Sequence, residues 1–182
     1  MAPFDREKWL KRARARLSRR GEEDRASALK AHAEDYLAID GLRVTTEWAR
    51  SKDIIVDFIK VQSGRFHSQS RRIEVSAHMA PVLQLYILLH ELGHFLIEDE
   101  GPTYVADRFP NGYRRIMDDV PGRGPLHKVD VIAEEFDAWS RGLTLAKHLG
   151  IEVDRQVFDD VRARYLVSYF KWATRRGRVS DG

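Results

Sequence analysis

The most apolar run of this 182-residue chain contains three groups that are costly to bury. Residues 88–97 read LLHELGHFLI, so His90, Glu91 and His94 stand among leucines, an isoleucine and a phenylalanine. Burying such groups without partners costs several kcal/mol. Residues four apart lie on one side of an α-helix, about 6 Å apart along its axis, so both imidazoles can point at one place. The run therefore predicts a buried helix in which the two imidazoles share one metal ion.

Glu91 directly follows His90 and projects beside that place, where a carboxylate can accept a proton from a metal-activated water molecule. The three residues form the H-E-x-x-H arrangement of zinc metallopeptidases. We expect His90 and His94 to bind Zn²⁺ and Glu91 to act as general base. The alternative is a pair of core histidines that hydrogen-bond to their surroundings, with Glu91 paired to an arginine.

A catalytic zinc ion normally has three protein ligands, and a chain without cysteine must supply them as imidazole or carboxylate. The best stretch is AEEFDAW, residues 133–139, on a later predicted helix. Glu135 falls on the expected core face of that helix while Glu134 turns away, so we expect Glu135 to be the third ligand. Asp137 is the rival ligand, and Glu134 or Asp137 could instead hold a ligand histidine by its second nitrogen. The residues expected on the core face are Ile132, Phe136, Trp139, Leu143 and Ala146.

HELGH followed by E-x-x-A at residues 135–138 resembles the glutamate zincins, and particularly the ImmA/IrrE-type metallopeptidases of bacteria and their phages. The resemblance covers roughly residues 72–150. It implies zinc held by His90, His94 and Glu135, with Glu91 as the general base.

This sequence departs from the family pattern at Trp139, where asparagine or aspartate is common, and in a long connection after the motif. The SprT-like proteases, which use a third histidine, are a weaker match. His127 and His148 would be the candidates for that third histidine.

The periodicity predicts a helix-rich α+β domain with a small, mostly antiparallel sheet. Two helices are expected before residue 40, divided at Gly21 and ended by a turn at Asp40-Gly41. Strands are expected at 42–48, 53–61 and 65–76. Helices follow at about 81–97, 129–149 and 153–174, with a long connection over 99–128. Gly93 would let the 129–149 helix approach the motif helix closely.

Length predicts a single-domain chain, with residues 1–40 as a basic helical appendage and 41–182 as the zincin-like domain. The net charge is only +3, but basic residues cluster in both termini. A binding protein that uses these termini to hold nucleic acid or a protein partner is therefore the alternative function. The first residues lack the apolar core of a secretory signal and no run is apolar enough for a membrane span, so we expect a cytoplasmic protein.

As an enzyme, the chain would be a zinc metalloendopeptidase acting on a peptide or protein. Residues 71–76, if they form an edge strand beside the motif helix, could pair with an extended substrate. The developing oxyanion needs a donor, and four residues of the long connection are candidates. They are Tyr104, Arg108, Tyr113 and His127, of which we predict His127.

Overall fold

The computed structural model describes residues 22–111 and 124–174, and their side chains from residue 34 onward. The helix expected within the first twenty residues, Tyr113, the basic N-terminal residues and the part of the basic C-terminal tail after Thr174 lie outside these ranges. The elements are α2 (Glu22–Ser51), β1 (Ile55–Ile59), β2 (Gly64–His67), β3 (Arg72–Ser76), α3 (Pro81–Asp99), α4 (Pro102–Arg108), α5 (Pro125–His148) and α6 (Arg155–Thr174).

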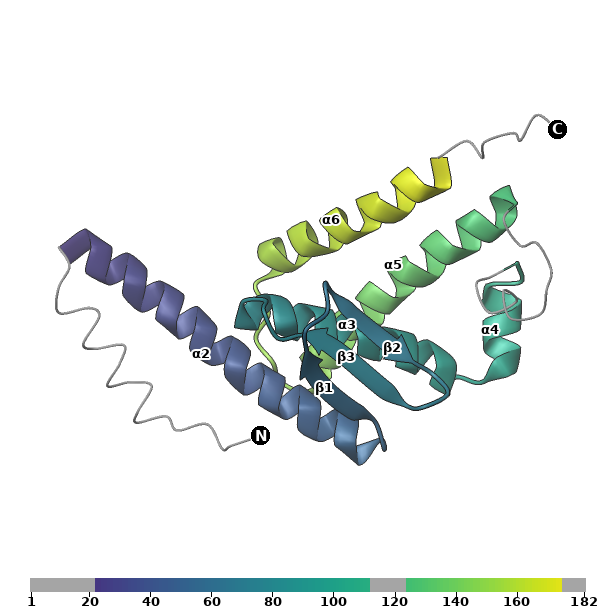
Figure 1. Cartoon of the computed structure of the whole chain (residues 1–182). Helices are drawn as coiled ribbons and strands as arrows, with labels where there is room; N and C mark the ends of the chain where they lie inside the picture. The colour runs from purple at the N-terminus through teal and green to yellow at the C-terminus, as the bar shows by residue number, and fades with distance from the viewer. Residues whose placement is uncertain (1–21, 112–123, 175–182) are drawn as a thin grey trace.

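The motif helix α3 lies at the centre of the fold, and α2, α5 and two strands of the sheet pack against it (Figure 1). Eleven of its residues are buried, among them His90 and Glu91. Pro81 opens the helix at a first-turn position where a backbone N–H is not needed. The expected buried motif helix is therefore confirmed, and with it the helix-rich α+β class.

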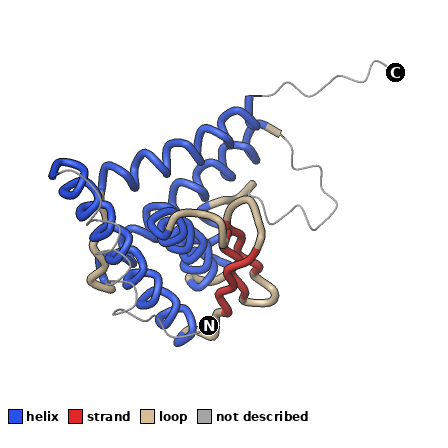
Figure 2. Tube along the Cα trace, turned by 60° about the vertical axis from the view of Figure 1, so that its left-hand side comes forward, coloured by secondary structure: helices blue, strands red, loops and turns tan. Residues whose placement is uncertain are grey.

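The small sheet lies on one flank of the helices, as Figure 2 shows in red. Its strand order is β1-β3-β2, with β1 parallel and β2 antiparallel to β3. The sheet is thus mixed rather than mostly antiparallel. Since β3 is the central strand, the expectation that residues 71–76 form an edge was wrong. The edge strand that contacts α3 is β2.

The strand expected over residues 42–48 is instead the last part of α2, which runs without interruption through Asp40-Gly41. Gly41 is buried, and a Cβ there would lie 2.8 Å from Leu85 and 3.0 Å from Ile151. Glycine at this position therefore serves close helix packing and not a turn. The expected domain boundary at residue 40 falls inside α2, and the division into appendage and domain stays a prediction.

The remaining elements follow the expected order with shifted boundaries. The long connection contains the short helix α4, and α5 begins at Pro125 instead of residue 129. The residues expected to form one strand from 65 to 76 form β2 and β3, separated by a turn. Of the helices within 22–111 and 124–174, none combines the length and apolarity needed to cross a bilayer.

Helices α3 and α5 touch backbone to backbone through two glycines. A Cβ on Gly93 would lie 1.9 Å from the carbonyl oxygen of Ala138, and a Cβ on Gly142 would lie 2.3 Å from that of Leu89. Each helix therefore contributes one glycine that packs against the backbone of the other helix. The close approach expected from Gly93 is confirmed, and Gly142 is its counterpart.

We predict that Gly93→Ala destabilises the protein by about 3 kcal/mol, near the upper end for overpacking, because the obstructing atoms belong to backbone. The separation of α3 from α5 should also abolish metal binding. Denaturant titration and metal analysis measure the two effects. Gly124→Ala, with open space around the added methyl group, is the control and should bind metal normally. Full metal binding by a folded Gly93→Ala protein would contradict this interpretation.

Candidate metal centre

His90 and His94 project from the same side of α3, as four-residue spacing requires. Their ring centroids are 4.7 Å apart and the ring planes stand at 73°. His90 is 5% exposed, and the side chain of His94 is 16% exposed. The site is therefore shielded, with its more accessible side at His94.

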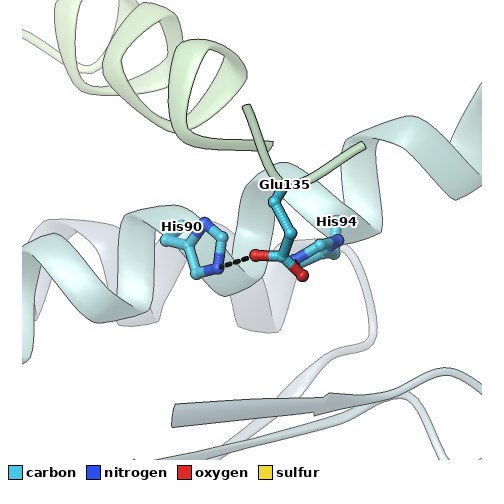
Figure 3. A group of neighbouring side chains, drawn as sticks. All are labelled: His90, His94 and Glu135. Atoms are coloured by element: carbon cyan, nitrogen blue, oxygen red, sulfur yellow. Dashed lines mark ion pairs between the residues drawn. The ribbon is translucent and has the colours of Figure 1, made fainter. Parts of the chain in front are cut away.

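Helix α5 brings the carboxylate of Glu135 between the two rings, as Figure 3 shows. One oxygen lies 3.3 Å from Nε2 of His90, and the other lies 3.5 Å from Nε2 of His94. The three possible ligand atoms lie within 4.8 Å of one another. Tetrahedral zinc with bonds of about 2.1 Å would place its ligand atoms about 3.4 Å apart. The group has the dimensions of a site for one small divalent ion.

The chemistry of these donors also fits a metal ion. Within the described part of the chain, Oε2 of Glu135 is buried and has no hydrogen-bond donor, although it lies 3.3 Å from His90. Leaving a buried carboxylate oxygen without a donor is costly. Two imidazoles and one carboxylate form a ligand set that zinc uses in catalytic sites. A bound cation would satisfy all three groups.

Glu134 also faces the cluster, so the expectation that it turns away was wrong. It is 5% exposed, and one of its oxygens lies 3.5 Å from Nδ1 of His94. A carboxylate on the second nitrogen fixes the orientation and the tautomer of a ligand histidine. This geometry favours the alternative role considered for Glu134, which is to hold His94 while Glu135 faces the ion.

The contacts within the cluster shift the pKa values of His94 and Glu135. Burial alone would lower the pKa of His94, but contacts with Glu134 and Glu135 outweigh burial and raise the pKa to about 10. Burial would raise the pKa of the Glu135 carboxyl, yet the two imidazoles hold that pKa well below its usual range. The carboxylates thus keep a positive charge in the metal-free cluster.

Glu91 lies on the sheet side of α3, close to the first residue of β2. It is 6% exposed, and a Cβ on Gly64 would lie 2.7 Å from its Oε1. Glycine at position 64 therefore leaves the space that the Glu91 carboxylate occupies beside the edge strand. No sequence pattern had indicated this role for Gly64.

The structure places the rival residues elsewhere. Asp137 pairs with Arg141 at 3.3 Å, while Arg141 also binds the Tyr104 hydroxyl at 2.7 Å. These contacts tie α4 to α5, and Asp137 does not belong to the group that His90, His94 and Glu135 form. Arg108 and His148 are exposed.

His127 is buried in the first turn of α5, with Nδ1 2.8 Å from the carbonyl oxygen of Asn111 and its ring edge-on to Trp172. It precedes Glu135 by two helical turns, about 12 Å along the axis. Its predicted part at the oxyanion stays a prediction.

The core face of α5 is rotated from the expected one. Phe136, expected in the core, is 51% exposed and lies against the guanidinium of Arg162. The residues of α5 that are buried are His127, Val131, Glu134, Glu135, Ala138, Trp139, Gly142, Leu145 and Ala146. The face that meets α3 therefore carries two glutamates and two small residues, which a search for an apolar stripe alone does not find.

Residues 55–119 match the model of a peptidase family described as the IrrE N-terminal-like domain. The expected resemblance to ImmA/IrrE-type metallopeptidases is thus confirmed over the sheet and the motif helix, and it supports a metallopeptidase-type domain. Glu135 lies outside the matched segment, so only its position beside the histidines connects it with the motif. Comparison with curated proteins and with solved structures gave no match.

We predict that the metal-free protein releases about one proton on binding Zn²⁺ at pH 7.5, because His94 is then protonated and must offer a free lone pair. Apparent affinity should rise about tenfold per pH unit up to about pH 10. Calorimetry in buffers of different ionisation enthalpy counts the proton. Glu134→Gln removes one carboxylate from His94 and should reduce the release, whereas equal release by both proteins would contradict the assigned pairing.

The pairing of His94 with Glu134 and Glu135 should also stabilise the folded state of the metal-free protein. Since the folded-state pKa of His94 is raised above its ordinary value of 6.5, this stabilisation is complete below about pH 6.5 and is lost as the pH rises through about 10.

Proposed function

We propose that this chain, as a protein with an IrrE N-terminal-like segment, is a zinc-dependent endopeptidase that hydrolyses peptide bonds in extended segments of peptides or proteins. One observation carries the proposal. A general-base candidate, Glu91, lies between a His-His-Glu group of metal-site dimensions and the edge strand of the sheet. A site that only stabilised the fold would not need this carboxylate.

Each residue of the site has a separate task in this proposal. His90, His94 and Glu135 hold the ion, and Glu134 orients His94. Zinc would supply Lewis acidity and lower the pKa of a water molecule. Glu91 accepts a proton from the attacking water and passes it to the leaving amine. Its burial beside Gly64 keeps the carboxylate in one position for both transfers.

The edge strand β2 offers a place to align the substrate. The amide of Ser76 at the end of β3 donates to the carbonyl of Ser63, the residue before β2, at 2.9 Å, which extends the antiparallel register of the two strands by one hydrogen-bonded pair. Alternation in an antiparallel pair then turns the backbone groups of Gly64 and Phe66 toward the free edge. An extended peptide can pair with them and run past Glu91. Peptides fit this arrangement better than compact small molecules.

We predict that Glu91→Gln retains zinc and loses cleavage by about 10²–10⁴-fold, the usual contribution of a general base. Cleavage of a mixture of extended peptides, followed by mass spectrometry, measures the loss, and metal analysis confirms that the site is loaded. Glu152→Gln is the matched control, because Glu152 is exposed and lies in the connection that follows α5. A zinc-loaded Glu91→Gln protein as active as its parent would refute the proposed chemistry.

Once a cleaved peptide is known, its backbone tests the proposed alignment. Methylation of a single amide nitrogen that pairs with β2 should weaken productive binding about 3–10-fold, the value of one hydrogen bond, while methylation at the next residue should have little effect. Kinetic comparison of the two methylated peptides measures the difference. Equal cleavage of both would speak against pairing at this edge.

A further inference from the structure

The two histidines of the cluster are held in different ways. Nδ1 of His94 lies 3.5 Å from Glu134, as is usual for a ligand histidine. Nδ1 of His90 is buried and has no hydrogen-bond partner within the described residues. On the side away from Glu135, the orientation of the His90 ring therefore depends on a contact other than a hydrogen bond.

That contact is the indole of Trp139. Its ring centroid is 4.4 Å from that of His90 and the two planes differ by only 19°, so the rings are stacked. Trp139 lies one residue after Ala138, at which the backbones of α3 and α5 meet. The backbone contact therefore fixes the distance between the indole and His90.

The indole is itself held on its other sides. Trp139 is fully buried, and helix α6 contributes Phe158 at 5.4 Å and Tyr165 at 5.7 Å between ring centroids. Phe158 packs in turn against Tyr86 on α3, at 5.1 Å. The ring over His90 therefore cannot turn without disturbing α6. A rigid flat surface of this kind limits rotation of the imidazole without using a hydrogen bond.

We propose that Trp139 is the positioning residue for His90. Trp139 holds the ring of His90 by stacking, whereas Glu134 holds the ring of His94 by its charge. The proposal rests on the metal site of the proposed function and adds to it a role for α6. Helix α6 supports the site through Trp139, although none of its described residues belongs to the metal-binding group.

The first test is metal affinity. Trp139→Leu should weaken Zn²⁺ binding about tenfold or more, the usual effect of losing an orienting partner, whereas Trp139→Phe keeps a ring over His90 and should lose less. Phe158→Leu is the matched control, because it removes an equally buried ring that contacts Trp139 but is not in the metal-binding group. It should lower the Tm to a similar extent but weaken Zn²⁺ binding clearly less than Trp139→Leu does, because the indole itself stays over His90.

Substitution with Co²⁺ provides a readout that packing alone would not change. The visible absorption of the Co²⁺ protein reports the geometry around the ion, and it should change much more in Trp139→Leu than in Phe158→Leu. A Trp139→Leu protein with the parental affinity and the parental spectrum would overturn the proposal. Equal loss of affinity in Trp139→Leu and Phe158→Leu would also overturn it, because the effect would then be general loosening of the core.

A second measurement remains informative if Trp139→Leu does not fold. The chain has four tryptophans, so replacing Trp9, Trp48 and Trp172 by Phe leaves Trp139 as the only one. Its emission should be strongly quenched when one equivalent of Co²⁺ binds, because the indole stacks on the proposed ligand His90. Unchanged emission with Co²⁺ bound would contradict the proposal. Absence of metal binding in the parent protein would instead refute the proposed function itself.

Discussion

The close contact between α3 and α5 brings together the residues of the candidate metal site. Two glycines, Gly93 and Gly142, let the backbones meet where any side chain would force them apart. Only at this separation does the carboxylate of Glu135 reach between two imidazoles that come from the other helix. The geometry of the site is thus a consequence of helix packing. Without it, the two histidines of α3 would have no carboxylate from α5 beside them.

Electrostatics explain why the site suits a cation. Three carboxylates, those of Glu91, Glu134 and Glu135, surround two imidazoles in a shielded part of the protein. Without a metal ion, a proton on His94 offsets part of this negative charge. A divalent ion would replace that proton and satisfy the buried carboxylate oxygen that has no donor. In the function that we propose, Glu91 would then exchange a proton with water at the edge of β2.

The sequence predicted the motif helix and the position of Glu135 beside the two histidines, because both depend on local spacing. Predictions from the sequence were wrong where tertiary packing determines the local structure. Asp40-Gly41 has the residues of a turn, but the chain stays helical there and Gly41 packs closely against Leu85. The central place of β3 depends on strand pairing, which spacing does not reveal. Glu135 was selected from a core face that wrongly included Phe136, so the selection agreed with the geometry for a partly mistaken reason.

We propose above all that His90, His94 and Glu135 together bind one divalent ion. Metal analysis of the purified protein tests it most directly, with His90→Ala and Glu135→Ala measured beside the parent. We expect one zinc ion per chain in the parent and little or none in either variant. Zinc retained in full by both variants would contradict it.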